Sequence, residues 1–168
     1  MIGLPASEAF IVTVWFGLVA LATVFDVAEL RIPNRICAAI AALYPAHVAA
    51  TGKLADVPAA LGMAAAVFIV GALLFRLGKM GGGDVKLMTV IALWAGPHTL
   101  SFIAVTTLAG GAMALVMTGR ARFVLAHTFE AVGADVARER VLGVHIPYAL
   151  AIACGASVAV VPALLGFA

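Results

Sequence analysis

Charged residues are scarce in this sequence, and their scarcity limits the class of protein. Lys, Arg, Asp and Glu make up 11% of the 168 residues, whereas hydrophobic residues make up 65%. A soluble domain carries about 25% charged residues and roughly half apolar ones. A soluble core of this size cannot hide the apolar excess, so we expect a membrane protein that uses the bilayer as its solvent.

Cysteine and histidine are also few, and their spacing gives no support to metal or thiol chemistry. Cys37 and Cys154 lie in different apolar segments, and no CxxC pair occurs. The four histidines are scattered without ligand spacing. HExxH and GxSxG motifs are absent as well. We therefore expect no metal and no cofactor, and nothing in the composition calls for a nucleic-acid partner.

Apolar segments, by contrast, follow one another along most of the chain, at about 8–26, 35–51, 57–75, 85–97, 99–118 and 146–166. Most approach the ~20 residues needed to cross ~30 Å of hydrocarbon. The fourth is shorter and needs tilting, local thinning of the bilayer or extension by the Gly-rich turn before it. Helices are expected because open sheet edges do not occur in lipid. The sequence thus predicts an all-α membrane protein with six transmembrane helices, in which residues 1–168 form a single integral membrane domain.

The positive charges predict the orientation of this domain. Nine of the ten basic residues lie on one side of the predicted spans, and only Lys53 lies on the other: Arg31, Arg35, Arg76, Lys79, Lys86, Arg120, Arg122, Arg138 and Arg140. Cytoplasmic loops carry the excess of Lys and Arg. The nine therefore mark the cytoplasmic side, and both termini are predicted to lie outside the cytoplasm.

One long polar stretch, residues 119–145, falls between the fifth and sixth predicted spans and is assigned to the cytoplasm. Its apolar residues have a partial helical spacing: Phe123, Val124, His127, Val132 and Val136. An amphipathic helix on the inner membrane surface and an ordinary connecting loop both fit this pattern.

Two carboxylates stand at the ends of predicted spans. Asp26 closes the first apolar run and is followed by Ile32-Pro33-Asn34, which is typical of a helix break and restart with Asn34 as N-cap. Asp84 opens the fourth run directly after Gly81-Gly82-Gly83. On the predicted topology both acids lie at cytoplasmic helix ends, so we expect them to lie at the same depth.

A pair of carboxylates at one depth has a specific chemistry. Two close carboxylates cannot both ionise easily, so they share a proton and titrate as a unit. One of them takes a proton from water while the other protonates the polarised group. Such a pair hydrolyses a peptide bond without a metal or a nucleophilic serine. The glycines before Asp84 are expected to let an extended substrate backbone come near.

Other interpretations of the acids stay open on the residues alone. Asp26 and Asp84 could cap helices at the interface or pair with Arg31 and Lys86. They could also form the carrier site of a small proton- or ion-coupled transporter, because paired intramembrane acids serve that purpose too. A non-catalytic scaffold would make both acids dispensable.

These motifs resemble a known family. Gly81-Gly82-Gly83-Asp84 fits the GxGD motif of intramembrane aspartyl proteases. Together with Asp26, Ile32-Pro33-Asn34 and Lys86-Leu87, it resembles the type IV prepilin peptidase family. Ile146-Pro147-Tyr148-Ala149 is similar to that family's Pro-Tyr/Phe-Gly segment, with Ala149 in place of glycine. The chain is most similar to the small, peptidase-only members of tight-adherence (Flp) pilus systems. Preflagellin and presenilin-like peptidases share the Asp and GxGD pairing, but the short length and Ile-Pro-Asn favour the prepilin branch.

The resemblance implies an aspartic endopeptidase of the bacterial cytoplasmic membrane. Its substrate would be a prepilin or pseudopilin, cut at the cytoplasmic boundary between a short basic leader and an apolar helix. Asp26 and Asp84 would be the catalytic acids, and cleavage would not be followed by N-methylation. Residues that support the site or bind substrate would be Gly81, Gly83, Lys86, Pro33, Asn34, Pro147 and Tyr148. For Lys86 we expect a contact with the Asp84 carboxylate or with phospholipid head groups. The oligomeric state is not predicted.

Overall fold

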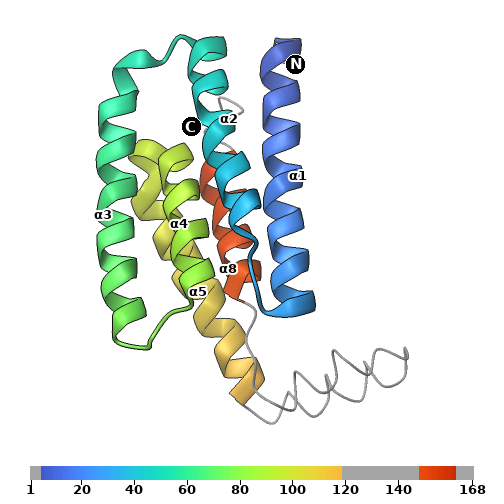
Figure 1. Ribbon diagram of the computed structural model, residues 1–168, viewed down its shortest axis with the longest axis vertical. Coiled ribbons are helices and arrows are strands. Elements are labelled where there is room, and N and C mark those ends of the chain that lie inside the picture. Colours follow the sequence, from blue (N-terminus) through green and yellow to red (C-terminus); the bar gives the residue numbers. More distant parts are fainter. Residues whose placement is uncertain (1–4, 119–147, 162–168) are drawn as a thin grey trace.

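The computed structural model describes residues 5–118 and 148–161, and within these ranges the protein is a bundle of helices without strands (Figure 1). Its elements are α1 (Ala6–Glu29), α2 (Asn34–Thr51), η1 (Leu54–Asp56), α3 (Val57–Arg76), α4 (Gly82–Ala95), η2 (Gly96–His98), α5 (Thr99–Thr118), α8 (Tyr148–Gly155) and η3 (Ala156–Val160). The all-helical prediction is confirmed for this part of the chain.

Successive long helices run in opposite directions along the bundle (Figure 1). The chain turns back between α1 and α2, between α2 and α3, between α3 and α4, and again at η2 before α5. As a result α1 and α3 end where α4 and α8 begin. We call this end of the bundle, which carries Asp26 and Asp84, the acid end.

Helix α4 is the centre of the packing. It contacts α3, α2, α8 and α5, so its apolar residues are covered from several sides. The most deeply buried large side chains of the bundle are Trp15, Ile40, Leu87, Ile91, Phe102, Ile152 and Val160. Trp94 adds a polar link, because its indole N–H donates to the backbone oxygen of Ile40 at 3.0 Å. These contacts fix α1, α2 and α4 relative to one another.

Many large apolar side chains face outward, as expected for helices in lipid. Phe10, Leu100 and Leu115 are 69%, 72% and 76% exposed. Lipid tails are as apolar as leucine, so such residues cost nothing on a bilayer-facing surface. Among the described residues, three stretches are long and apolar enough to cross a membrane: Ala6–Glu29, Leu54–Arg76 and Gly82–Val116. The third of these contains both α4 and α5, and the number of six spans stays a prediction.

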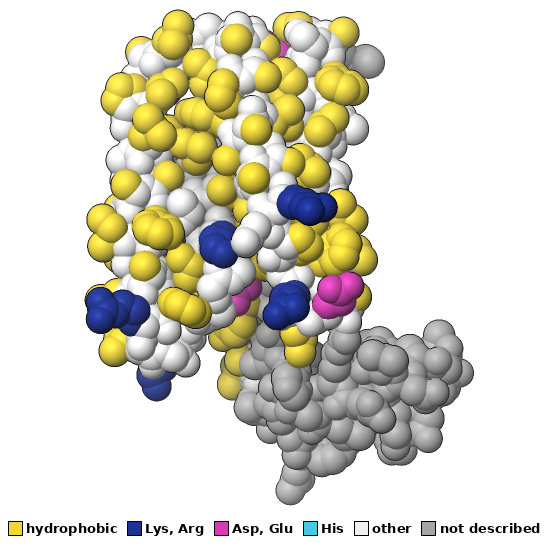
Figure 2. All heavy atoms as spheres, in the orientation of Figure 1, with side chains coloured by type: hydrophobic (Ala, Val, Ile, Leu, Met, Phe, Trp, Pro, Cys, Tyr) yellow, Lys and Arg dark blue, Asp and Glu magenta, His cyan; other side chains and the backbone are white. Residues whose placement is uncertain are grey.

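Basic side chains gather toward the acid end. On the face shown in Figure 2 the Lys and Arg side chains lie from the middle of the bundle downward, and apolar side chains dominate the upper part. The chain order accounts for this distribution: five of the six basic residues in the described ranges flank the turns at the acid end, and Lys53 precedes α3 at the opposite end. The other four basic residues, the 119–145 segment and both termini lie outside the described residues, so the predicted sidedness remains untested.

Candidate active site

The turn between α1 and α2 begins in a strained conformation. Leu30 is the C-cap of α1 with φ 52° and ψ 37°, and its N–H donates to the backbone oxygen of Asp26 at 2.9 Å. A left-handed conformation is unfavourable for a residue with a Cβ, which is why glycine usually takes this position. The chain reverses between Glu29 and Asn34, and Asp26 lies in the last turn of α1.

The helix restart after this turn differs from the sequence prediction by one residue. Pro33 occupies the N-cap position of α2, and Asn34 is the first helical residue, without a side-chain capping bond. The prediction that Asn34 caps α2 was therefore wrong. The reason lies in tertiary structure: Lys86 of α4 donates to Asn34 Oδ1 at 2.8 Å, so the amide oxygen is directed to another helix.

The Gly-rich turn positions Asp84 in the first turn of α4. Gly81 is the N-cap, and Asp84 is the third residue of the helix. The Asp84 carboxylate folds back onto the cap: it accepts a hydrogen bond from the Gly81 backbone N–H, and a Cβ at residue 81 would lie 2.8 Å from Asp84 Oδ2. This is the reciprocal half of a capping box, in which the third helical residue binds the N-cap amide.

Glycine is needed in this turn mainly for close packing. A Cβ at Gly83 would lie 3.2 Å from the Ile32 Cβ, and one at Gly82 would lie 3.3 Å from the Phe75 ring. Of the glycines in this turn only Gly78, with φ 66°, has a backbone conformation that disfavours side chains. The start of α4 can therefore lie directly against the α1–α2 turn, which brings the two acids toward each other.

Both acids line one pocket of about 580 Å³ at the acid end. Its walls come from the α1–α2 turn and the start of α4: Asp26, Glu29, Leu30, Arg31, Ile32, Pro33, Asn34, Gly81, Gly82, Gly83, Asp84 and Lys86. The charges of Asp26 and Asp84 are close enough to interact. The structure thus brings together seven of the nine site residues predicted from the sequence, although their roles stay predictions.

Asp26 is held by a third part of the chain, the start of α8. The side chain of Asp26 is 7% exposed, and its Oδ2 accepts a hydrogen bond of 2.9 Å from the Ala149 backbone N–H. Thr23, one turn before Asp26, approaches the Ala149 oxygen at 3.5 Å. The first amides of a helix have no partner within the helix, so a carboxylate there is favourably placed.

The other residues that were expected to contact the acids or the substrate lie elsewhere or bind other partners. Lys86 binds Asn34, and within the described ranges neither acid forms an ion pair with Arg31 or Lys86. Tyr148 lines a second, apolar cavity instead of the acid pocket. Pro147 lies outside the described residues. Among the residues that the structure describes, no group of three or more His, Cys, Asp or Glu side chains is arranged to hold a metal ion.

Two features of the site had no readable signal in the sequence. The Ala149 amide is a backbone donor, so the identity of residue 149 does not reveal it. The fit of Ile32 against Gly83 depends on how the α1–α2 turn meets α4. The segment containing Ala149 did stand out as part of the Pro-Tyr-Ala motif, and this was the only sequence hint that the start of α8 belongs near the acids.

Comparison with known proteins identifies the family of the chain. Neither the curated proteins nor the solved structures yielded a significant match to the chain. The model of the type IV leader peptidase family matches residues 11–118, which include Asp26, Asp84 and the turns that line the acid pocket. The matched region covers more than half of the sequence, and its apolar helices are those of a membrane protein. This chain therefore belongs to the type IV leader peptidase family.

Proposed function

We propose that the protein is an aspartic endopeptidase of the bacterial cytoplasmic membrane that removes the leader from prepilins or pseudopilins. One observation carries this proposal: Asp26 and Asp84, from two different helices, line the same pocket at one end of the bundle. The family is one of leader peptidases, and in the described part of the chain neither acid is neutralised by an ion pair with the basic residues of the pocket.

Two interacting carboxylates suit hydrolysis by an activated water molecule. The pair holds one shared proton, because two close carboxylates do not both ionise readily. The unprotonated carboxylate takes a proton from water as the water oxygen attacks the scissile carbonyl carbon, and the protonated one gives its proton to the carbonyl oxygen. The resulting diol collapses as the carboxylate that gave up its proton takes one back from a diol hydroxyl. The carboxyl group that received the proton of water gives it to the leaving nitrogen as the C–N bond breaks.

The hydrogen bonds around the acids prepare this geometry. The Ala149 amide holds one oxygen of Asp26, and the Gly81 amide holds the Asp84 carboxylate at the helix start. The bond between Lys86 and Asn34 ties α4 to the start of α2 beside both acids. Holding reacting groups in place before the substrate arrives reduces the ordering needed in the transition state.

The acid end is proposed to face the cytoplasm. Five basic residues flank its turns, and the positive-inside rule assigns such loops to the cytoplasmic side. The leader would then be removed at the inner membrane boundary, by a site that needs no metal or cofactor. A peptidase-only role in a tight-adherence (Flp) pilus system is the narrower form of this proposal.

A transporter is less well supported. Carrier sites of secondary transporters lie near the bilayer midplane, between helices that are interrupted there. Asp26 lies near the C-terminal end of α1 and Asp84 in the first turn of α4, so both acids are at the end of the bundle.

The test is leader removal by carboxamide variants. Asp26→Asn and Asp84→Asn keep the size of each side chain but abolish its ability to take or give a proton. We expect either change to reduce cleavage of a co-expressed prepilin by at least 1,000-fold. This factor lies within the range that general acid–base catalysis contributes to a reaction rate. Processing is followed by the gel shift between precursor and mature pilin.

Asp56→Asn is the matched control, because Asp56 lies in η1 at the opposite end of the bundle. It should process the prepilin at the wild-type rate. Membrane levels of all three variants are measured on the same gels. Full processing by either Asp26→Asn or Asp84→Asn would overturn the proposed function.

A further inference from the structure

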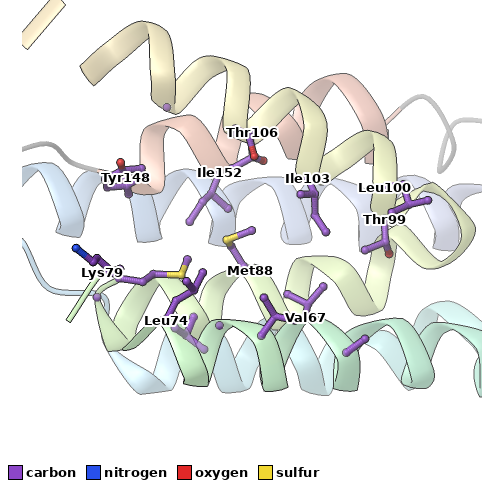
Figure 3. Close-up of a pocket in the computed structure, with 18 of the residues that line it drawn as sticks. Val67, Leu74, Lys79, Met88, Thr99, Leu100, Ile103, Thr106, Tyr148 and Ile152 are labelled. Carbon is purple, nitrogen blue, oxygen red and sulfur yellow. The ribbon is translucent and has the colours of Figure 1, made fainter. Parts of the chain in front are cut away.

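A second cavity, of about 840 Å³, lies along the bundle between α3 and α5. In Figure 3, Val67 and Leu74 reach into it from α3, Met88 from α4 and Ile103 from α5. Helix α3 packs chiefly against α4, and α5 packs chiefly against α8. The two outer helices therefore form facing walls, and α4 forms the floor between them. We call this cavity the α3–α5 groove.

The groove has the form of a site for another helix. Its α3 wall is one face of that helix, with residues spaced by three or four: Met63, Ala66, Val67, Val70, Gly71 and Leu74. Leu100, Ile103, Thr107 and Gly111 form the same kind of stripe on α5. From Met63 to Leu74 the wall is about 16 Å long at 1.5 Å per residue, which equals about three helical turns. Apolar helices dock into such grooves through one face.

The groove and the acid pocket meet at Gly81, which lines both cavities. The residues before it, Gly78 to Met80, line the groove at the acid end, and those after it lead to Asp84. A chain that leaves the groove at this end therefore reaches the two acids across a residue without a side chain. This continuity separates the groove from an ordinary lipid-facing furrow.

We propose that the α3–α5 groove binds the apolar helix of the prepilin and that the peptide bond to be cut passes over Gly81 to Asp26 and Asp84. This inference rests on the proposed function and adds to it a binding site for the part of the substrate that is not cleaved. The occupant is a single apolar helix whose end at the acid pocket is unwound.

The groove has room for such an occupant on its α5 wall. A Cβ built at Gly111 meets no atom within 4 Å, so the α5 wall is open at this point. Small residues let helix backbones approach closely in membranes.

Filling the groove tests the proposal. Gly111→Trp adds a large side chain where the resting protein has space, in the part of the groove toward the acid end but outside the residues that line the acid pocket. Two substrates are compared: a full prepilin, and a soluble peptide that carries only the leader and the residues around the cleavage site. We expect kcat/KM for the full prepilin to fall at least 10-fold, mainly through KM, and kcat/KM for the short peptide to change less than twofold.

Gly62→Trp is the matched control. Gly62 lies on α3 outside the groove and is exposed, and a Cβ added there would meet no atom within 4 Å. The Gly62→Trp variant should cleave both substrates at the wild-type rate. If Gly111→Trp processes the full prepilin as well as the wild type, or loses both substrates equally, the groove proposal is wrong while the proposed function stands. If the wild type cleaves neither substrate, the proposed function itself fails.

Photo-crosslinking gives a second, independent readout. A benzophenone side chain is introduced at Val67, which lines the groove, or at its neighbour Phe68, which is 50% exposed and lies outside it. The Asp84→Asn variant is used so that bound prepilin is not cleaved. We expect a prepilin adduct from position 67 and not from position 68. Adducts with lipid alone at position 67 would show that the groove is a lipid site and would overturn the inference.

Discussion

Individual residues of the acid pocket are fixed by partners that lie far away in the sequence. Asp26 is bound by the amide of Ala149, 123 residues away, and Asn34 by Lys86, 52 residues away. Hydrogen bonds to a charged group contribute about 1.5–3 kcal/mol, more than bonds between neutral groups. The orientation of Asp26 therefore depends on α8 being in place, although residue 149 itself contributes only backbone.

The Ala149 amide can be removed by proline. Ala149 is the second residue of α8, in the first turn where a helix tolerates proline. We expect Ala149→Pro to lower kcat for prepilin cleavage about 10- to 100-fold with little change in KM, because a bond worth about 1.5–3 kcal/mol is lost. Steady-state kinetics on purified protein measure the effect.

Ala149→Gly is the companion variant, since it keeps the N–H and needs less space. It should retain kcat within about threefold of the wild type. Wild-type kcat in Ala149→Pro would mean that the amide does not position Asp26. An equal loss in both variants would assign the effect to the packing of α8 instead.

At the scale of elements, the α1–α2 turn and the start of α4 form the site together. Gly83 allows the approach of Ile32, and Gly81 is the cap that binds Asp84. The sequence prediction assigned these glycines to the approach of a substrate backbone. For Gly83 the structure provides an internal reason, because Ile32 occupies the space where its side chain would be. For Gly81 the approach of a substrate stays a prediction, and Gly81 borders both cavities.

The strained end of α1 gives a prediction about stability. Leu30 has φ 52°, a conformation that costs about 1–2 kcal/mol for residues with a Cβ. We expect the free energy of unfolding of Leu30→Gly to exceed that of Leu30→Ala by about 1 kcal/mol. Both variants lose the same leucine contacts, but only glycine releases the strain. Unfolding in mixed detergent and SDS micelles measures the difference. Equal stabilities of the two variants would show that the turn relaxes without strain.

On the scale of the whole molecule, alternating helix directions bring the acids to one end. Asp26 closes a helix that runs toward this end, and Asp84 opens one that runs away from it. The basic residues flank the same turns, so charge distribution and candidate site belong to one face of the protein. If its substrates present their leaders to the cytoplasm, a leader peptidase needs its active site at the end of the bundle that carries the basic residues.

The predicted sidedness can be checked at the two ends of α3. Lys53 precedes α3 and Arg76 ends it. In a background with Cys37→Ala and Cys154→Ala, a membrane-impermeant maleimide should label Lys53→Cys in intact spheroplasts. Arg76→Cys should react only after the membrane is permeabilised. The reverse pattern would invert the orientation, and labelling of both positions in intact spheroplasts would mean that α3 does not cross the membrane.

Much of this protein could be predicted from its sequence because the signals are local. Apolar runs of about 20 residues predict helices in a bilayer, since every backbone group must find its partner within the segment. Pro33 predicts a break, and Gly81-Gly82-Gly83-Asp84 predicts a helix start with an acid. Alternation of spans then places Asp26 and Asp84 at the same end, which the fold agrees with. Even the one-residue error at Asn34 arose from a contact with α4 that no local pattern contains.

Tertiary structure decided what depends on distant segments coming together. The shared pocket exists because Ile32 fits against Gly83, and Asp26 is oriented by a backbone amide of α8. The α3–α5 groove exists because α3 packs chiefly on α4 and α5 chiefly on α8, which leaves a space between them that Val85 and Met88 of α4 line. The composition and order of residues were sufficient to predict the helices of the described ranges, their approximate ends and the candidate acids. The pocket and the groove required the packing of helices, because close contacts between small residues depend on three-dimensional fit and not on the sequence of either partner alone.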